Sequence, residues 1–437
     1  MRLGHAITVL LSLFGLLTVG VSTDAAGDNW PSWRGSNSNG VAENADPPVT
    51  WSETKNIKWK VAIPGDGEST PIIWGDKIFF QTAVPTAEKS SPASDAPRSI
   101  AKIPTAPLKF NVLCLDRETG ALLWERTARE EIPHEGRHPT GSFSSYSPVT
   151  DGELLWASFG SRGLHCYDLD GNHQWSDDLI QMQITAEFGE GSSPVLAGDA
   201  VIVLMDHEGE SKIFAFNKKT GDPLWEQDRD EPSSWTSPVA VEVEGAYQVI
   251  TNAKNYIRSY DAQSGELIWR IAGRSDGPIP SPVEAFGNVY CAGGYREYSI
   301  MAIELGHTGD LSSTDALVWH TEEESPYVAT PLIYDENMYV ITGYRGKLSC
   351  FDTQTGKQHY SGQRLEGVRQ IYASPTGAGG RVYIAGRKGT TVVIKHSTKF
   401  EVLATNVLDD GFDASPVVVG DELYLRGEKY LYCIAEK

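Results

Sequence analysis

Residues 193–225 read SPVLAGDAVIVLMDHEGESKIFAFNKKTGDPLW, four short apolar stretches separated by turns. We expect strands at residues 194–197, 201–205, 213–217 and 224–227, labelled A to D in chain order. Glycine-containing turns follow the first and third strands, and a polar loop separates the second from the third. The β-branched residues and the period of two leave no room for a helix, so the unit predicts a four-stranded antiparallel sheet.

The same pattern recurs eight times along the chain. Each copy begins with Ser or Thr, then Pro and an apolar run, and after a first interval of 77 residues the Pro residues lie 41 to 49 residues apart. Later in most copies a turn ending in Gly precedes an aromatic residue, as in Gly221 and Trp225. A period in the 40s with such turns is typical of propeller blades. The eight prolines are Pro71, Pro148, Pro194, Pro238, Pro282, Pro331, Pro375 and Pro416.

The two ends of the chain complete one another. The eighth copy ends at Tyr432-Cys433-Ile434 and lacks strand D, whereas residues 56–61 carry the strand D aromatic, Trp59, ahead of the first copy. We therefore predict an all-β fold: an eight-bladed β-propeller of four-stranded antiparallel blades, closed by an N-terminal strand that completes the last blade.

The strand D aromatics are predicted to be structural. Wedged between neighbouring blades, each would bury about 150–250 Å². At about 25 cal/mol per Å², that burial is worth a few kcal/mol per residue. The tryptophans concerned are Trp59, Trp124, Trp175, Trp225, Trp269 and Trp319.

The five cysteines predict neither disulfides nor thiol chemistry. Cys114, Cys166, Cys350 and Cys433 all fall at one position of strand C, where other copies have Ala or Ser, and Cys291 falls in strand B. This position calls for a small buried side chain. Equivalent positions in different blades also stand too far apart for a bridge.

Two segments are expected to lie outside the blades. Residues 1–25 combine an early Arg2, an apolar run and small residues before the expected cleavage point, which predicts a signal peptide and an exported mature chain of residues 26–437. The alternative, a membrane anchor, requires a longer apolar run. The insertion at residues 84–108 carries five prolines among Ser, Ala and Lys and predicts a disordered surface loop in the first blade; an attachment segment is the alternative.

Charge narrows the possible partners. Lys and Arg number 37 against 58 Asp and Glu, a formal net charge of −21. Such a chain lacks the basic surface that nucleic acid requires and gains nothing from an anionic membrane. We expect a monomer with no integral membrane segment after cleavage, in the periplasm or secreted.

One face of the propeller is predicted to bind a ligand. The A–B and C–D turns are bland, whereas the B–C and D–A loops on the other face are charged and differ between blades. Free drift of loops is the alternative explanation. The many Arg residues of this rim favour an anionic group such as a carboxylate. The candidate residues are His134, His138, Arg162, Asp206, His207, Glu208, Arg229, Asp230, Glu231, Trp235, Asn252, Tyr295, Arg296, Arg345, Arg387, Lys388 and Arg426.

Residues 134–138 match the zinc-protease pattern H-E-x-x-H, in which both histidines must lie on one face of a helix. Here Pro133 and Pro139 bracket the motif and Gly136 interrupts it, within a D–A loop of an all-β chain. We therefore predict no metal site from this motif.

The repeats resemble those of the pyrroloquinoline-quinone (PQQ) dehydrogenase-like propellers. The resemblance rests on Ser-Pro-Val, Gly-Asp, the Leu-x-Cys/Ala-x-Asp strand and Thr-Gly-x-x-x-Trp, together with the lead-in Trp30-Pro31-Ser32-Trp33-Arg34-Gly35, and covers residues 29–437. This family includes quinoprotein alcohol and glucose dehydrogenases and a propeller lipoprotein of outer-membrane assembly. The chain departs from the dehydrogenases in lacking a vicinal Cys-Cys pair and from the lipoprotein in lacking a lipidated Cys.

Two functions remain open. The favoured one is an exported, non-catalytic propeller that binds a protein partner or a small ligand on the B–C/D–A face, with no cofactor. The alternative is a dehydrogenase of alcohols or sugars that holds PQQ and Ca²⁺ over the channel. Clustered carboxylates such as Asp230 and Glu231 leave room for other enzymes, including carbohydrate-active ones.

Overall fold

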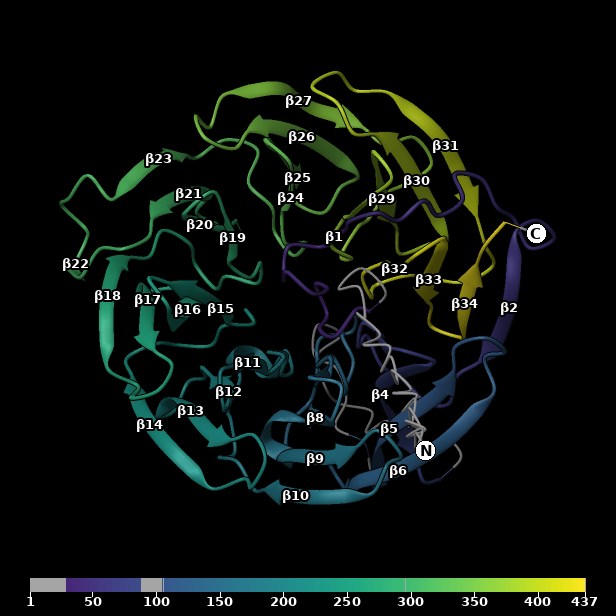
Figure 1. Ribbon diagram of the computed structural model, residues 1–437, viewed down its shortest axis with the longest axis horizontal. Helices are drawn as coiled ribbons and strands as arrows, with labels where there is room; N and C mark the ends of the chain where they lie inside the picture. The colour runs from purple at the N-terminus through teal and green to yellow at the C-terminus, as the bar shows by residue number, and fades with distance from the viewer. Residues whose placement is uncertain (1–28, 88–103, 105, 295, 437) are drawn as a thin grey trace, which may run out of the picture.

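A computed structural model describes residues 29–87, 104, 106–294 and 296–436. Its strands form eight sheets arranged as blades around a central axis (Figure 1), which confirms the predicted eight-bladed propeller. Within each blade neighbouring strands pair antiparallel, and the first strand lies innermost.

The blades are four consecutive strands each, except where noted below. Blade 1 contains β3 (Ile72–Trp74), β4 (Lys77–Pro85), β5 (Leu108–Asp116) and β6 (Leu122–Glu131). Blade 2 contains β7 (Val149–Thr150), β8 (Leu154–Ser158), β9 (Leu164–Asp168) and β10 (His173–Asp177). Blade 3 contains β11 (Val195–Ala197), β12 (Ala200–Met205), β13 (Ser211–Asn217) and β14 (Pro223–Arg229). Blade 4 contains β15 (Val239–Val243), β16 (Ala246–Asn252), β17 (Tyr256–Asp261) and β18 (Leu267–Ala272).

The second half follows the same plan. Blade 5 contains β19 (Val283–Ala285), β20 (Asn288–Gly293), β21 (Ser299–Glu304) and β23 (Leu317–Thr321). Blade 6 contains β24 (Leu332–Tyr334), β25 (Asn337–Ile341), β26 (Lys347–Asp352) and β27 (Gln358–Arg364). Blade 7 contains β28 (Thr376–Ala378), β29 (Arg381–Ala385), β30 (Thr390–Lys395) and β31 (Val402–Val407). Blade 8 contains β32 (Val417–Val419), β33 (Glu422–Arg426), β34 (Tyr430–Ile434) and, from the N-terminal region, β2 (Ile57–Ala62).

Strand β2 closes the ring as predicted. It pairs antiparallel with β34, with Trp59 opposite Cys433, and so forms the outer strand of blade 8 (Figure 1). Two short strands add to other sheets: β22 (Gly309–Asp310) pairs with β18, and β1 (Val41–Ala42) pairs parallel with β28.

Most of the tryptophans predicted to be structural make one repeated contact between blades. Trp225 packs over Gly265 of the next blade, and its indole N–H donates to the carbonyl oxygen of Ala262 at 3.0 Å. Trp269 departs from this pattern: it is fully buried beside Leu311, which follows the extra strand β22. The same contact of an indole with a Gly and a carbonyl of the next blade is made by Trp59, Trp124, Trp175 and Trp319.

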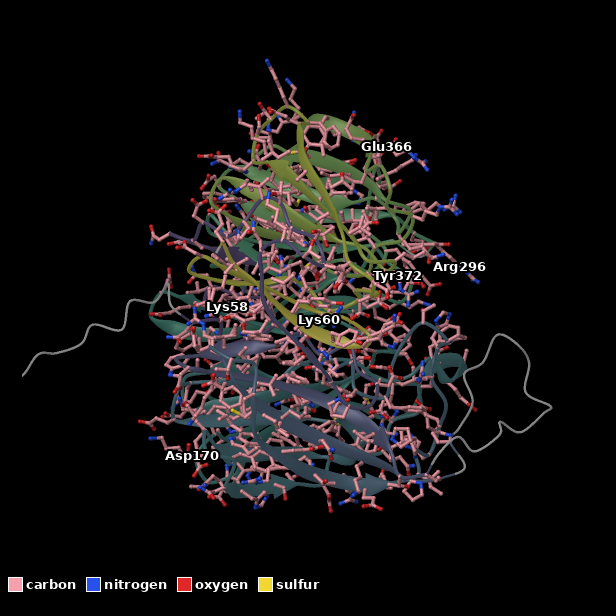
Figure 2. All side chains as sticks on the ribbon, turned by 90° about the vertical axis from the view of Figure 1, so that its right-hand side faces the viewer. Lys58, Lys60, Asp170, Arg296, Glu366 and Tyr372 are labelled. Carbon is pink, nitrogen blue, oxygen red and sulfur yellow. The ribbon has the colours of Figure 1, made fainter. Side chains whose placement is uncertain are left out.

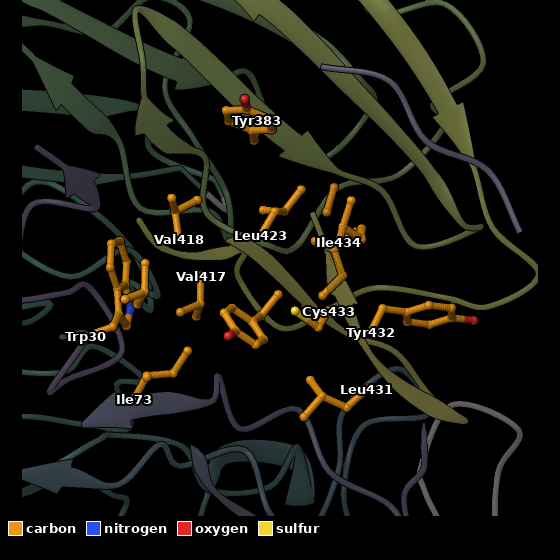
Figure 3. Packing of buried hydrophobic residues seen from close by; sticks show 14 of the residues in the cluster. Trp30, Ile73, Tyr383, Val417, Val418, Leu423, Leu431, Tyr432, Cys433 and Ile434 are labelled. Carbon is orange, nitrogen blue, oxygen red and sulfur yellow. The ribbon is translucent and has the colours of Figure 1, made fainter. Parts of the chain in front are cut away.

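The N-terminal segment 29–47 forms a plug that crosses from blade 1 to blades 6 and 7, which the repeat pattern did not predict. Trp30 forms a β-bridge with Ile73 of the inner strand β3, and Figure 3 shows it in the same apolar cluster as Val417. Arg34, 2% exposed, donates to the carbonyl oxygens of Pro331 and Pro375 at 3.3 and 2.8 Å. Burial without a carboxylate partner lowers the pKa of Arg34 to about 9.

The remaining predictions concern single segments. All five cysteines are buried and unbridged.

Strands β4 and β5 reach Pro85 and Leu108, so the two ends of the predicted insertion belong to blade 1. Residues 88–103 and 105 lie outside the described residues, as does the predicted signal peptide at residues 1–25. No helix in the described part of the chain has the length and hydropathy needed to cross a membrane.

Candidate functional site

A cavity of about 710 Å³ lies at one mouth of the channel. We call it the mouth cavity. All eight D–A loops contribute to its wall, including Glu68, Ser145, Phe188 and Tyr327, and Trp33 of the N-terminal segment also lines it. Figure 2 places Arg296 and Tyr372, both lining residues, on the face opposite Asp170, a C–D turn residue. The cavity thus opens on the predicted B–C/D–A face.

A closed ring of hydrogen bonds surrounds the channel at the cavity wall. In each blade the backbone N–H of the Ser or Thr before the repeat Pro donates to the side-chain hydroxyl of the equivalent residue in the next blade, at 2.8–3.1 Å. All eight residues are buried, and all line the cavity. This hydroxyl belt consists of Thr70, Ser147, Ser193, Ser237, Ser281, Thr330, Ser374 and Ser415.

The belt explains why Ser or Thr precedes each Pro. The hydroxyl oxygen accepts the N–H of the preceding blade, and without it a buried donor would be left unsatisfied. A hydroxyl that accepts one bond still has a proton to donate. The Ser/Thr-Pro signature was visible in the sequence, but nothing in its spacing indicated that eight separate copies would join in one ring.

Three carboxylates of the wall have their own counter-ions. Asp413 accepts two bonds from Nε of Arg387 at 2.6 and 2.9 Å. Glu190 accepts a bond from Arg162 at 2.9 Å. The third carboxylate, Asp276, forms an ion pair with Lys254 at 2.7 Å.

Glu68 is the remaining carboxyl of the described wall. Burial, together with the negative charges of Asp413 and Asp66, raises the pKa of Glu68 to about 8. This residue is therefore largely protonated at neutral pH, and the Ser145 hydroxyl donates to its carboxyl at 3.4 Å.

Aromatic side chains contribute to the wall of the cavity. Tyr327 and Tyr372 each contact Tyr344, at ring distances of 5.6 and 6.4 Å. Across the mouth, Trp235 donates its indole N–H to the carbonyl oxygen of Gly189 at 2.7 Å. Trp33 of the N-terminal segment also lines the cavity, beside the buried Arg34.

Three of the predicted site residues line the cavity: His138, Trp235 and Arg296. Two more, Arg162 and Arg387, lie behind it as the counter-ions of lining carboxylates. His134 is half-buried and contacts the carbonyl oxygen of Met182 at 2.6 Å. The exposed Glu208, Asp230, Arg345 and Lys388 do not line the cavity, and Tyr295 lies outside the described residues.

Six further candidates are buried parts of the framework. Arg229 forms a two-bond ion pair with Asp206, and neither side chain has any exposed surface. Asn252 donates to two carbonyl oxygens, those of Pro280 and Ala292, and Glu231 forms an ion pair with Arg258. Loop position alone therefore misplaced residues whose side chains turn inward. The remaining two candidates, His207 and Arg426, are also buried.

The predicted Arg-rich mouth is wrong for the same reason. Arg162, Arg229 and Arg387 are already paired with carboxylates, and Arg426 donates to the carbonyl oxygen of Ser69 from a fully buried position. Among the described lining residues, Arg296 is the one guanidinium.

The H-E-x-x-H motif does not form a zinc-protease site. His134 and His138 diverge, since Nδ1 of His138 contacts the Thr140 hydroxyl at 2.7 Å. His134, Glu135 and Glu190 do come within 4.8 Å of one another at their ligand atoms. Glu190, however, already accepts bonds from the side chains of Tyr146, Ser161 and Arg162 and from the Ser161 N–H, which leaves it no lone pair for a metal.

The cavity wall is a poor match for PQQ and Ca²⁺. PQQ is a planar tricarboxylate, which would need several available cations, whereas the guanidiniums of Arg162 and Arg387 are committed to Glu190 and Asp413. Ca²⁺ requires six to eight oxygen ligands, including carboxylates that are not already held by cations.

Comparisons with known proteins support the propeller and its family. The family model described as outer membrane protein assembly factor BamB matches residues 109–361. A comparison with curated protein sequences finds no match. Among solved structures, BamB from Moraxella catarrhalis is 12% identical, with a TM-score of 0.57, over 86% of this chain and 98% of that one.

Two further solved structures are similar. The computationally designed Ika8 protein is 13% identical with a TM-score of 0.53, over 78% of this chain and 98% of that one. A europium-containing methanol dehydrogenase is 12% identical with a TM-score of 0.44, over 91% and 89% of the two chains. At these identities the structures show the fold alone. The family model spans more than half of the chain, and the protein therefore belongs to the PQQ-like propeller family described as outer membrane protein assembly factor BamB.

Proposed function

We propose that this protein is an exported, non-catalytic propeller that binds a small ligand, or a segment of a protein partner, in the mouth cavity. One observation carries the proposal: eight copies of one repeat contribute eight different D–A loops to a single cavity, which Trp33 of the N-terminal segment also lines. Outside the belt, the lining changes from Glu68 to Phe188 to Trp235 around the ring. Its volume lies within the range of small-molecule sites, about 300–1,000 Å³.

Ion pairing of three of the four carboxyls of the described wall, all but Glu68, supports binding rather than catalysis. A general base or nucleophile needs a lone pair that can reach the substrate. Asp413, Glu190 and Asp276 are held by cations. Nδ1 of His138 accepts the backbone N–H of Thr140 at 3.2 Å, so its contact with the Thr140 hydroxyl belongs to a local turn.

A cavity-filling variant tests the site. Gly141 lines the cavity, its backbone is outside the left-handed region, and an added Cβ would meet nothing closer than 3.7 Å. Gly141→Trp should therefore fold and fill the mouth. Ala246→Trp is the matched control, because Ala246 is exposed at the start of β16, next to an A–B turn of the opposite face.

The readout is recovery of bound molecules by the purified mature chain. Wild type and Ala246→Trp should retain a ligand, or capture a partner from periplasmic extract, that Gly141→Trp loses, and the ligand should be recovered chemically unchanged. Equal capture by Gly141→Trp, or turnover of the ligand, contradicts the proposal. N-terminal sequencing of the exported chain tests cleavage after residue 25.

A further inference from the structure

We infer that the ligand of the mouth cavity is a neutral saccharide. This inference rests on the proposed function and names the ligand class of the same site. Three properties of the described wall carry it: carboxylates paired with the protein's own cations, a dense set of hydroxyl groups, and two half-buried aromatic side chains from different blades.

Charge balance argues against ionic ligands. Each ionised carboxylate of the wall has a cation within 2.9 Å that belongs to the protein, namely Arg387 for Asp413, Arg162 for Glu190 and Lys254 for Asp276. A cationic ligand would have to compete with these pairs, and an anionic ligand would face carboxylates whose cations are already used. A neutral ligand meets neither penalty.

The hydroxyl groups match a polyol. The eight belt hydroxyls accept backbone N–H groups, and for none of them does a described residue accept the remaining proton, so these protons can be donated into the cavity. Outside the belt, Thr140, Ser142, Ser145 and Thr185 add further hydroxyls to the wall. Of the paired carboxylates, Asp413 and Asp276 still have oxygen lone pairs that can accept from a sugar hydroxyl, whereas those of Glu190 are already used.

Aromatic faces supply the apolar part of the recognition. One face of a pyranose ring presents C–H groups, and its burial against an aromatic ring removes apolar surface from water. Tyr372 lines the cavity on the side of blades 6 and 7, and Trp235 lines it on the side of blades 3 and 4. A ligand between them can be held by both its rings and its hydroxyls.

An array of neutral, anionic and amino-containing glycans, probed with the labelled mature chain, identifies the ligand, and titration calorimetry then measures it. We expect neutral glycans to bind and the Kd to change less than about threefold between 50 and 500 mM NaCl, because only charged contacts are screened by salt. Gly141→Trp should abolish the binding.

Variants of the aromatic wall test the recognition. Tyr372→Leu should weaken binding about tenfold, since a lost stacking contact of about 1.4 kcal/mol is tenfold in Kd. Tyr372→Phe keeps the ring and should stay within about twofold of wild type. Tyr247→Leu, an exposed tyrosine of the opposite face, is the control, and thermal unfolding establishes that every variant is folded.

The outcomes separate this inference from the proposed function. Salt-sensitive binding of a charged glycan or of the diamine putrescine, lost in Gly141→Trp, overturns the saccharide inference and leaves the binding function standing. If no neutral glycan binds, the saccharide inference is also wrong. Binding that survives in Gly141→Trp contradicts both.

Discussion

The backbone N–H of Ser415 donates a hydrogen bond of 3.1 Å to the side-chain hydroxyl of Thr70, although the two residues are 345 positions apart in the chain. This bond closes the hydroxyl belt, because Thr70 in turn donates its N–H to Ser147 at 2.9 Å. The propeller is therefore closed twice: at its outer edge by β2 against β34, and at the channel by this ring.

Removing one hydroxyl from the belt should destabilise the whole ring. Ser237→Ala leaves the buried N–H of Ser193 without its acceptor and should cost about 1–3 kcal/mol of unfolding free energy. Ser237→Thr should cost far less, because Thr already serves at positions 70 and 330. Urea unfolding of the two variants measures the difference, and equal losses would contradict the role of the hydroxyl.

The tryptophan contact between blades predicts a difference between two glycines. Gly265 has φ +74° and a Cβ there would lie 2.6 Å from the Trp225 ring, whereas Gly245 has φ +83° and open space around it. Both Ala variants carry the backbone strain, about 1–2 kcal/mol. Gly265→Ala should lose a further 1–3 kcal/mol or so from the clash. The difference between their urea midpoints isolates the packing, and identical midpoints would exclude it.

The buried pair Asp206–Arg229 should matter for stability and not for binding. Arg229→Met leaves Asp206 buried without a cation and should cost about 3–5 kcal/mol. Asp206→Asn combined with Arg229→Met should recover part of that loss, because no charge is then left unpaired. At a temperature where the double variant is folded, its ligand affinity should equal that of wild type; a weakened affinity would return this pair to the binding site.

Glu68 makes stability depend on pH in a defined direction. Because its folded pKa is raised to about 8 from an ordinary value of 4.5, the folded chain holds more protons than the unfolded chain between these values. Stability should therefore fall as pH rises through this window. Burial also raises the pKa of Glu135, to about 7. This residue therefore makes stability fall with rising pH in the lower part of the same pH window.

Glu68→Gln separates the two contributions. The amide cannot ionise, so the melting temperature of this variant should fall less than that of wild type between pH 7 and 8.5, whereas Glu135 titrates alike in both proteins. Scanning calorimetry across this range gives the comparison. Parallel curves for the two proteins would show that the Glu68 carboxyl is not desolvated in solution.

Much of the fold could be predicted from residues that repeat. The Pro that follows Ser193, the turn at Gly221 and the wedge at Trp225 occur in near-equivalent form around the ring, because each blade solves the same local packing problem. The N-terminal strand that carries Trp59 could be assigned to blade 8 because the last repeat copy lacked its strand D. The plug formed by Trp30 and Arg34 is a single copy with no counterpart in the blades, so periodicity held no information about it.

Loop sequence was a poor guide to the site, because loop position does not reveal where a side chain points. Asp206 and Arg229 turn into the framework, whereas the short hydroxyls of Ser237 and Ser281, which look unremarkable in sequence, line the cavity. By itself the sequence determined the eight-bladed propeller and its closure, since local strand and turn preferences are repeated eight times. Only the tertiary structure decided which charges neutralise one another and that eight hydroxyls form one ring, because these contacts join residues from different blades.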